Sequence, residues 1–479
     1  MQPALAKPAA PSPVLLAARS ALGRLWITVF ACVALVPAFG YTTLAFGAAI
    51  GLASFLPARR RSILSALAIL VCVRNLNLKL VGGAAILSAN SVPLGALALG
   101  AAWILILSTW TRLFARVPRW LGRHSLLLLH GAAVALIVVL WALRQLAVIN
   151  AFAAGALCTL VPELLWRSAY WIKWRGRETG RSPIWANLFA ILPFVGAGGV
   201  PIGKGPAYLA KHEVRDADRL AIAQVEGVKL LALALLWQAA DGVLSCVLWR
   251  FKAEWLPAWI VPARRLLPTM DLLLRLPMRF PLWQRWACLY GELFHAILVL
   301  AVYSHTIVGI FCLLGFHIPR NMKSPLLATT ILDFWGRYYF YFKELLMDFW
   351  FFPVFLRTSR FPVLWRTMLA TMSAAFLGNL YYHLVLYWPA LAAGNWTTFR
   401  NQAAARVIYC ALLAAGLCGS FARSLKRRSS VSSAPIPRRV FQVLMVLGFF
   451  ALIHVWNFID PVIPAARRLA LWQALLPWR

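Results

Sequence analysis

Acidic residues are scarce in this chain of 479 residues: Asp and Glu number 14 against 48 Lys and Arg, which gives a formal net charge of +34. In a soluble protein this balance would favour nucleic-acid binding. The chain is, however, 62% hydrophobic, whereas soluble domains average about 45–50%. We therefore assign the basic residues to short loops that meet anionic lipid headgroups, as the positive-inside rule requires, and we expect no nucleic-acid partner.

The chain also lacks the cysteine pairs and histidine spacings of metal sites. Its eight cysteines lie in apolar segments without a C-x-x-C pair, so we predict buried thiols and no metal site. The N-terminal half contains no glycine-rich phosphate loop, nucleotide motif or internal repeat. The N-terminus lacks the pattern of a cleavable signal peptide. These absences leave the first 155 residues without recognisable chemistry.

Long apolar runs are what the sequence has in abundance. Runs of about 18–25 residues recur along its whole length, and each can cross a bilayer as a helix. We predict an all-α polytopic integral membrane protein with about 10–12 transmembrane helices plus re-entrant or interfacial helices. The expected spans lie near 26–56, 62–74, 80–109, 125–160, 217–250, 287–316, 330–360, 366–390, 403–422 and 440–458.

The predicted organisation has four parts. They are a tail (1–25), N-terminal transmembrane helices (26–159), a core (160–390) and C-terminal transmembrane helices (391–479) with a basic cytoplasmic loop at 423–439. The first span is broken near Pro37–Gly40, so it is one long span or a helical hairpin. Glycines and prolines between 193 and 206 forbid a regular helix there. That stretch is an extramembrane loop or a re-entrant loop that lines a cavity.

Ionisable residues gather in one apolar stretch, from Ser324 to His383. Because charged groups at membrane depth are costly, they are candidate functional residues. The group comprises Asp333, Arg337, Lys343, Glu344, Asp348 and His383. We expect the rest of the chain to act as a scaffold for this region.

The order of residues from Tyr303 to His383 resembles the signature region of the membrane-bound O-acyltransferases. The most similar branch is bacterial and O-acetylates alginate and similar polysaccharides or transfers D-alanine to teichoic acids. The matching positions are Tyr303, Ser304, Gly315, Phe316, Pro319, Asn321, Ser324, Pro325, Asp333, Phe334, Trp335, Arg337, Asp348, Phe349, Pro353 and His383. A weaker likeness extends over about residues 160–390. The chain departs from the family pattern at five positions. The family's first histidine falls on Tyr339, its first arginine on Gly336 and the tryptophan before the catalytic histidine on Tyr382. The aspartate after the Gly-Tyr-Ser segment falls on His305, and the glycine after the catalytic histidine on Leu384.

The resemblance implies a central tunnel in which a thioester donor from the cytoplasm meets a hydroxyl from the other face. The implied reaction moves an acyl group, with acetyl preferred, to a polysaccharide or another envelope acceptor. It implies no bound cofactor, because the acyl-CoA or acyl carrier is a co-substrate. The implied partners are an acyl carrier protein on the cytoplasmic side, a periplasmic acyltransferase and membrane lipids. The implied location is the cell inner membrane.

His383 is the predicted general base, because a neutral imidazole can take the proton of an attacking hydroxyl. Asn379 lies one turn earlier on the same face, where it would orient His383, polarise the donor carbonyl or hydrogen-bond between helices. Tyr339 would donate a hydrogen bond to the oxyanion or the acceptor, or would only pack. The phenol is a poor base at neutral pH.

Five further residues are predicted to bind substrate: Arg337, Trp335, Asp348, Ser304 and Tyr382. Arg337 has an alternative role, in which it pairs with Asp333 or Asp348 and shapes the loop.

Two other functions stay open. A family member that has lost its chemistry would serve as a scaffold or acyl conduit, and the tyrosine at 339 motivates this alternative. A transporter or flippase for an anionic lipid-linked substrate would explain the basic residues and broken helices, although no inverted repeat is apparent.

Overall fold

The computed structural model describes residues 12–81, 125–148, 151–173, 184–190, 200–202, 204–251, 262, 264–426, 435–458 and 463–476. Within these ranges the chain is helical, and its β structure is limited to an isolated bridge between Glu213 and Phe316. Seven segments of the described chain are long and apolar enough to cross a membrane. They are Ala21–Phe55, Leu126–Gln145, Ala217–Trp249, Leu282–Leu313, Val363–Leu386, Trp396–Ser424 and Ile436–Asn457. The chain is therefore an all-α, multi-pass membrane protein, and the span expected near 80–109 lies outside the described residues.

The chain divides into two compact units. Unit 1 comprises Met1–Ala133, Glu163–Leu236 and Val302–Arg320, and unit 2 comprises Val134–Pro162, Trp237–Ala301 and Asn321–Arg479. Four helices have residues in both units. They are α7 (Ser125–Gln145), α8 (Ala151–Lys173), α10 (Ala217–Trp249) and α12 (Leu282–Leu313).

A helical hairpin opens unit 1. After the short α1 (Pro13–Arg19), α2 (Ala21–Phe39) and α3 (Thr43–Phe55) pack against each other. Gly40, with φ of 55°, ends α2 in a conformation that suits glycine. The side chain of Cys32 lies where a side chain at Gly47 would be, so the two helices approach closely. Of the two predicted forms of residues 26–56, the structure has the hairpin.

The remaining helices of unit 1 join distant parts of the sequence. They are α4 (Arg60–Val81), α9 (Pro206–His212) and the 3₁₀ segments η1 (Gly40–Thr42), η2 (Pro57–Arg59) and η3 (Ile184–Ala190). The span expected at 62–74 lies within α4. Most of the glycine- and proline-rich stretch from 193 to 206 lies outside the described residues, so its two interpretations stay open.

The range 125–160, expected as one span, contains the end of α7 and the start of α8. Ala147 has a positive φ of 56°, which lies outside the right-handed helical region, so α7 cannot continue through it. α8 then continues without interruption through residues 159 and 160, where the sequence suggested a boundary.

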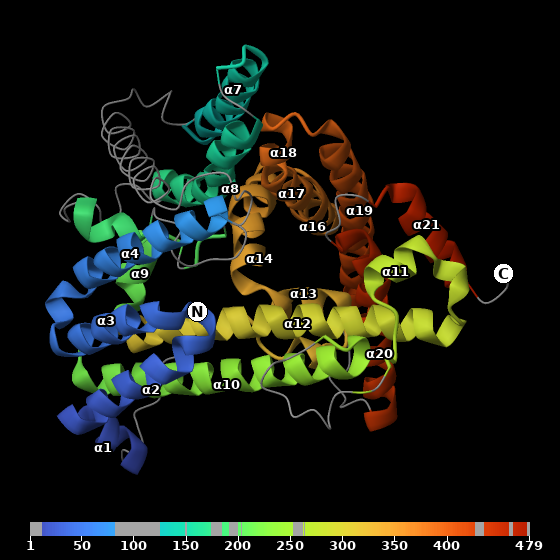
Figure 1. Ribbon diagram of the computed structural model, residues 1–479. Coiled ribbons are helices and arrows are strands. Elements are labelled where there is room, and N and C mark those ends of the chain that lie inside the picture. The colour runs from blue at the N-terminus through green and yellow to red at the C-terminus, as the bar shows by residue number, and fades with distance from the viewer. Residues whose placement is uncertain are drawn as a thin grey trace. The chain divides into compact units, whose positions relative to one another are not determined.

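Unit 2 contains most of the C-terminal half of the chain. Its first helices are α11 (Met270–Arg275), α13 (Ile331–Tyr338), α14 (Phe340–Leu346) and α15 (Phe352–Arg357). The later ones are α16 (Val363–Met372), α17 (Asn379–Leu386), α18 (Trp388–Ala392), α19 (Trp396–Lys426), α20 (Ile436–Asn457) and α21 (Ala465–Ala474). Its shorter segments are η5 (Pro277–Arg279), η6 (Pro325–Leu327), η7 (Met347–Phe351) and η8 (Ser373–Gly378). In Figure 1, α16, α17 and α18 pack beside α19.

The prediction of a membrane span near 330–360 is wrong. The helix breaks at Tyr339, between α13 and a continuous helical run formed by α14, η7 and α15, and none of the candidate spans of the described chain lies here. Tyr339 has φ of −145° and ψ of 83°, outside the helical region, so α13 and α14 cannot form one helix. The predicted spans at 366–390, 403–422 and 440–458 correspond to α16–α17, α19 and α20.

Candidate functional site

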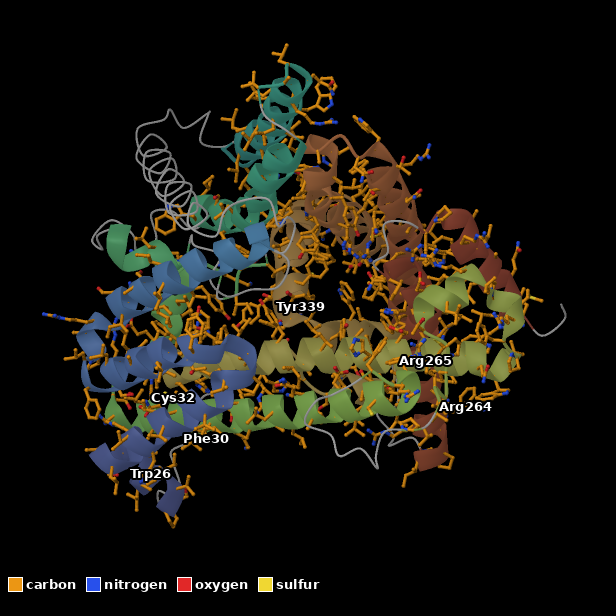
Figure 2. The ribbon with its side chains drawn as sticks, viewed as in Figure 1. Trp26, Phe30, Cys32, Arg264, Arg265 and Tyr339 are labelled. Carbon is orange, nitrogen blue, oxygen red and sulfur yellow. The ribbon has the colours of Figure 1, made fainter. Side chains whose placement is uncertain are left out.

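The joint between α13 and α14 is fixed by Asn321, which is 1% exposed. Its backbone carbonyl accepts a hydrogen bond from the N–H of Phe340 at 2.8 Å, and its side-chain oxygen accepts one from the N–H of Tyr341 at 3.0 Å. These are the first N–H groups of α14, which have no partner inside their own helix. Asn321 therefore caps α14 from a separate loop and fixes the backbone directly after Tyr339. Tyr339 is labelled in Figure 2.

α13 begins with a side-chain cap and carries an ion pair. The hydroxyl of Thr330 accepts a hydrogen bond from the N–H of Asp333 at 3.0 Å, as an N-cap does. Arg337 Nε donates to Asp333 Oδ1 at 2.7 Å across one turn. The two side chains are 36% and 34% exposed, so the pair contributes modestly to stability. This contact matches the predicted pairing of Arg337, and its predicted role in substrate binding stays a prediction.

A chain of aromatic rings joins the α13–α14 joint to α17. The ring of Phe342 contacts Tyr339 at 5.7 Å, Trp335 at 6.0 Å and Tyr382 at 4.7 Å between ring centroids. The ring of Tyr382 in turn lies 5.4 Å from that of His383. Four of the predicted site residues therefore lie in one connected cluster. Phe342 is the centre of that cluster, and sequence reasoning missed it because a phenylalanine carries no chemical signal.

Two π-helical segments pack together beside this cluster. Asp348 and Trp350 lie in η7, and η8 ends at Gly378, directly before Asn379. A Cβ at Gly378 would lie 2.6 Å from the ring of Trp350, so only glycine leaves space for that ring. π-Helical turns inside longer helices are frequent at functional sites. The contact places Asp348 in the segment that packs on η8, and its predicted role in binding stays a prediction.

Asn379 and His383 carry buried polar atoms without hydrogen-bond partners. Asn379 is 0% exposed, and both its Nδ2 and its Oδ1 are unpaired. Nδ1 of His383 is also buried and unpaired, although the side chain as a whole is half-buried. An unpaired buried polar atom costs about 1–3 kcal/mol. Asn379 therefore does not hydrogen-bond between helices here, and both side chains present unused hydrogen-bonding atoms to a ligand.

Arg406 on α19 is a second residue that sequence reasoning missed. It is 2% exposed; Nε donates to Tyr387 Oη at 2.8 Å and Nη1 donates to Asn457 Oδ1. Its guanidinium lies 5.9 Å from the ring centroid of Tyr409, and the ring of Tyr409 lies 6.2 Å from that of His383. The sequence signal was an arginine inside an apolar run. That signal does not distinguish a buried arginine from a basic residue near the end of a transmembrane helix.

Ser304 lies on α12 in unit 1 and is 1% exposed. The other seven predicted site residues belong to unit 2. Its predicted role in binding stays a prediction.

No cluster of three His, Cys, Asp or Glu side chains suited to a metal occurs in the described part of the chain. Comparison with known proteins adds no further assignment, since no family model and no curated protein matches the chain. The resemblance to the membrane-bound O-acyltransferases therefore depends on the sequence blocks between Tyr303 and His383 alone.

Proposed function

We propose that this chain is a membrane-bound O-acyltransferase of the cell inner membrane. It moves an acyl group, preferably acetyl, from a cytoplasmic thioester to a hydroxyl of a polysaccharide or another envelope acceptor. One observation carries this proposal. Two of the sequence blocks that resemble the family, both in unit 2, are in contact through their aromatic rings, from Tyr339 through Phe342 and Tyr382 to His383.

In the proposed reaction, the acceptor hydroxyl attacks the thioester carbonyl while the imidazole of His383 takes its proton. The carbon–sulfur bond then breaks, and the thiolate leaves and is reprotonated. The amide of Asn379, whose two polar atoms have no partner in the described structure, donates to the carbonyl oxygen as negative charge develops. Tyr339 and Trp335 border the acceptor, and Arg337, Asp348 and Tyr382 support the binding of substrate. The role in substrate binding that the resemblance implies for Ser304, in unit 1, stays a separate proposal.

The proposed co-substrate is acyl-CoA or an acyl carrier protein, and no bound cofactor is invoked. A periplasmic acyltransferase is a proposed partner in handing the acyl group to the final acceptor. Support for a membrane setting comes from the seven candidate spans.

The test is the ester-linked acyl content of envelopes from cells that carry the wild-type chain or His383→Ala. Loss of the general base should lower acyl transfer by about 10²–10⁴-fold. His317→Ala is the matched control, because His317 is exposed and lies outside the cluster. Normal acylation in His383→Ala at an unchanged protein level would rule the mechanism out.

A scaffold or acyl conduit without chemistry is the first alternative, favoured by the tyrosine at 339. Tyr339→His separates the two, because a scaffold should be indifferent to this change whereas an acyltransferase should change its rate.

Transport of an anionic lipid-linked substrate is the second alternative. It is favoured by an ion pair between two candidate spans, in which His295 Nδ1 lies 2.7 Å from Asp241 Oδ1. Ionisable pairs inside membranes often mark transport pathways. Transport into protein-containing vesicles without any acyl donor would support this alternative.

A further inference from the structure

The interior face of α19 changes character along its length. Gln402 and Arg406 are 3% and 2% exposed, and they are followed on the same face by buried Cys410, Leu413 and Leu417. The residues recur every three or four positions, as one buried stripe of a helix does. The stripe is polar at its N-terminal end and apolar at its C-terminal end. Its polar end therefore packs against polar groups, which include Tyr387 and Asn457.

Arg406 carries a buried charge that is paired with no opposite charge among the described residues. Its hydrogen-bond partners, Tyr387 and Asn457, are neutral, and so is the ring of Tyr409. No carboxylate among the described residues pairs with it. A charge removed from water without a counter-ion is strongly unfavourable. A guanidinium has five N–H donors, and the two contacts leave donors for another acceptor.

The space beside Arg406 contains other unused polar atoms. The guanidinium is close enough to His383 for a direct electrostatic interaction, and Tyr409 contacts both side chains. Nδ1 of His383 and both amide atoms of Asn379 are buried and unpaired. The buried guanidinium of Arg406 and the unpaired Nδ1 of His383 therefore lie on either side of Tyr409, and the unpaired amide of Asn379 lies one turn before His383 on α17, a helix that contacts α19.

We propose that Arg406 binds an anionic group, a carboxylate or a phosphate, of the molecule whose hydroxyl is turned toward His383. The anion accepts hydrogen bonds from the free guanidinium donors, and Tyr387 and Asn457 hold the guanidinium in place. The proposal rests on the proposed function for the role of the ligand as acceptor substrate. The binding itself does not require acyl transfer.

The probes are sodium glucuronate, inorganic phosphate and phosphatidylglycerol, each added to the full chain in a neutral detergent at constant ionic strength. Glucose and phosphatidylcholine are the uncharged or zwitterionic controls. The readout is the apparent midpoint of thermal unfolding, followed by tryptophan fluorescence, because a ligand that binds the folded state raises this midpoint. A response to glucuronate or phosphate identifies a water-borne anion, and a response to phosphatidylglycerol alone identifies a lipid headgroup.

Arg406→Gln should weaken the apparent binding constant by about tenfold or more, since it removes the charge from a buried hydrogen-bonded pair. Arg423→Gln is the matched control, because Arg423 lies on the same helix and is exposed. Arg406→Lys keeps the charge and loses the planar fork, so it should weaken binding several-fold, and it replaces the glutamine variant if that variant does not fold. The proposal is overturned if no anion stabilises the wild type, or if both Arg406 variants respond as the wild type does.

His383→Ala separates this proposal from the function. It should lose acyl transfer and keep the anion response. A chain in which His383→Ala transfers acyl groups normally but Arg406→Gln loses the anion response would refute the acyltransferase and leave the anion site standing.

Discussion

Two buried arginines, Arg60 in unit 1 and Arg406 in unit 2, are each 2% exposed and have opposite surroundings. Arg60 Nε donates to the carbonyl of Ala53 at 3.0 Å, near the C-terminus of α3, and Nη1 donates to the carbonyl of Val214. A helix C-terminus carries partial negative charge, which suits a cation. The carboxylate of Glu213 is near enough to act on Arg60, although burial outweighs it and lowers the pKa of Arg60.

Arg406 lies within a candidate span and has neutral side chains as partners. The difference in hydrogen-bond partners indicates that Arg60 is a structural arginine, whereas Arg406 is available to a ligand. Arg60 has two backbone carbonyls as partners and a carboxylate nearby, so its contacts complete the fold, although burial still lowers its pKa. Arg406 is held by two neutral side chains and has no carboxylate partner among the described residues, so an anion bound there would supply the opposite charge.

The largest expected effect is on Arg60. Arg60→Gln should destabilise the protein by about 3 kcal/mol or more, because it leaves two buried carbonyls unpaired. Arg406→Gln should change stability less, because it removes an uncompensated buried charge together with its contacts. Apparent thermal midpoints of both variants in the same detergent test the comparison, and equal losses would contradict it.

An intermediate effect is expected at Gly378. Gly378→Val would place atoms in the ring of Trp350 and should destabilise the contact between η7 and η8 by about 1–3 kcal/mol. Acyl transfer should fall as well, because Asn379 and His383 follow η8 directly. Gly336→Ala is the control, since a Cβ at Gly336 meets nothing within 4 Å. The measurement is the apparent midpoint of thermal unfolding. A Gly378→Val protein with the wild-type midpoint would show that the contact between η7 and η8 does not contribute to stability.

The smallest effect on stability is expected at Asn379. Asn379→Leu replaces an amide with no hydrogen bonds by an apolar group of similar size, so stability should stay within about 1 kcal/mol or increase. Acyl transfer should nevertheless fall. A structural amide would show the reverse pattern, a large loss of stability with little specific loss of activity, and that result would remove Asn379 from the site.

The sequence predicted those features that depend on local pattern. Apolar runs were enough to predict α19 and α20, and the spacing of Asp333 and Arg337 was enough to expect their pairing. The break at Tyr339 was not predictable, because it depends on hydrogen bonds from Asn321 in a separate loop. The burial of Arg406 was equally hidden, since one sequence cannot distinguish an interior arginine from one in a basic loop. The close approach of Trp350 to Gly378 depends on tertiary packing.

The hairpin formed by α2 and α3 bears on the number of times the chain crosses the membrane. Its two ends lie together, since the guanidinium of Arg24 near the start of α2 donates to the carbonyl of Ser54 near the end of α3 at 3.2 Å. A chain that turns back in this way leaves the bilayer on the side where it entered, whatever depth it reaches. Arg24 and the Arg59–Arg61 turn therefore lie at the same end of the hairpin, which the positive-inside rule predicts to be the cytoplasmic end. Ala21–Phe55 is one of the seven candidate segments, so counting it as one crossing rather than as a hairpin would invert the assigned side of every later loop.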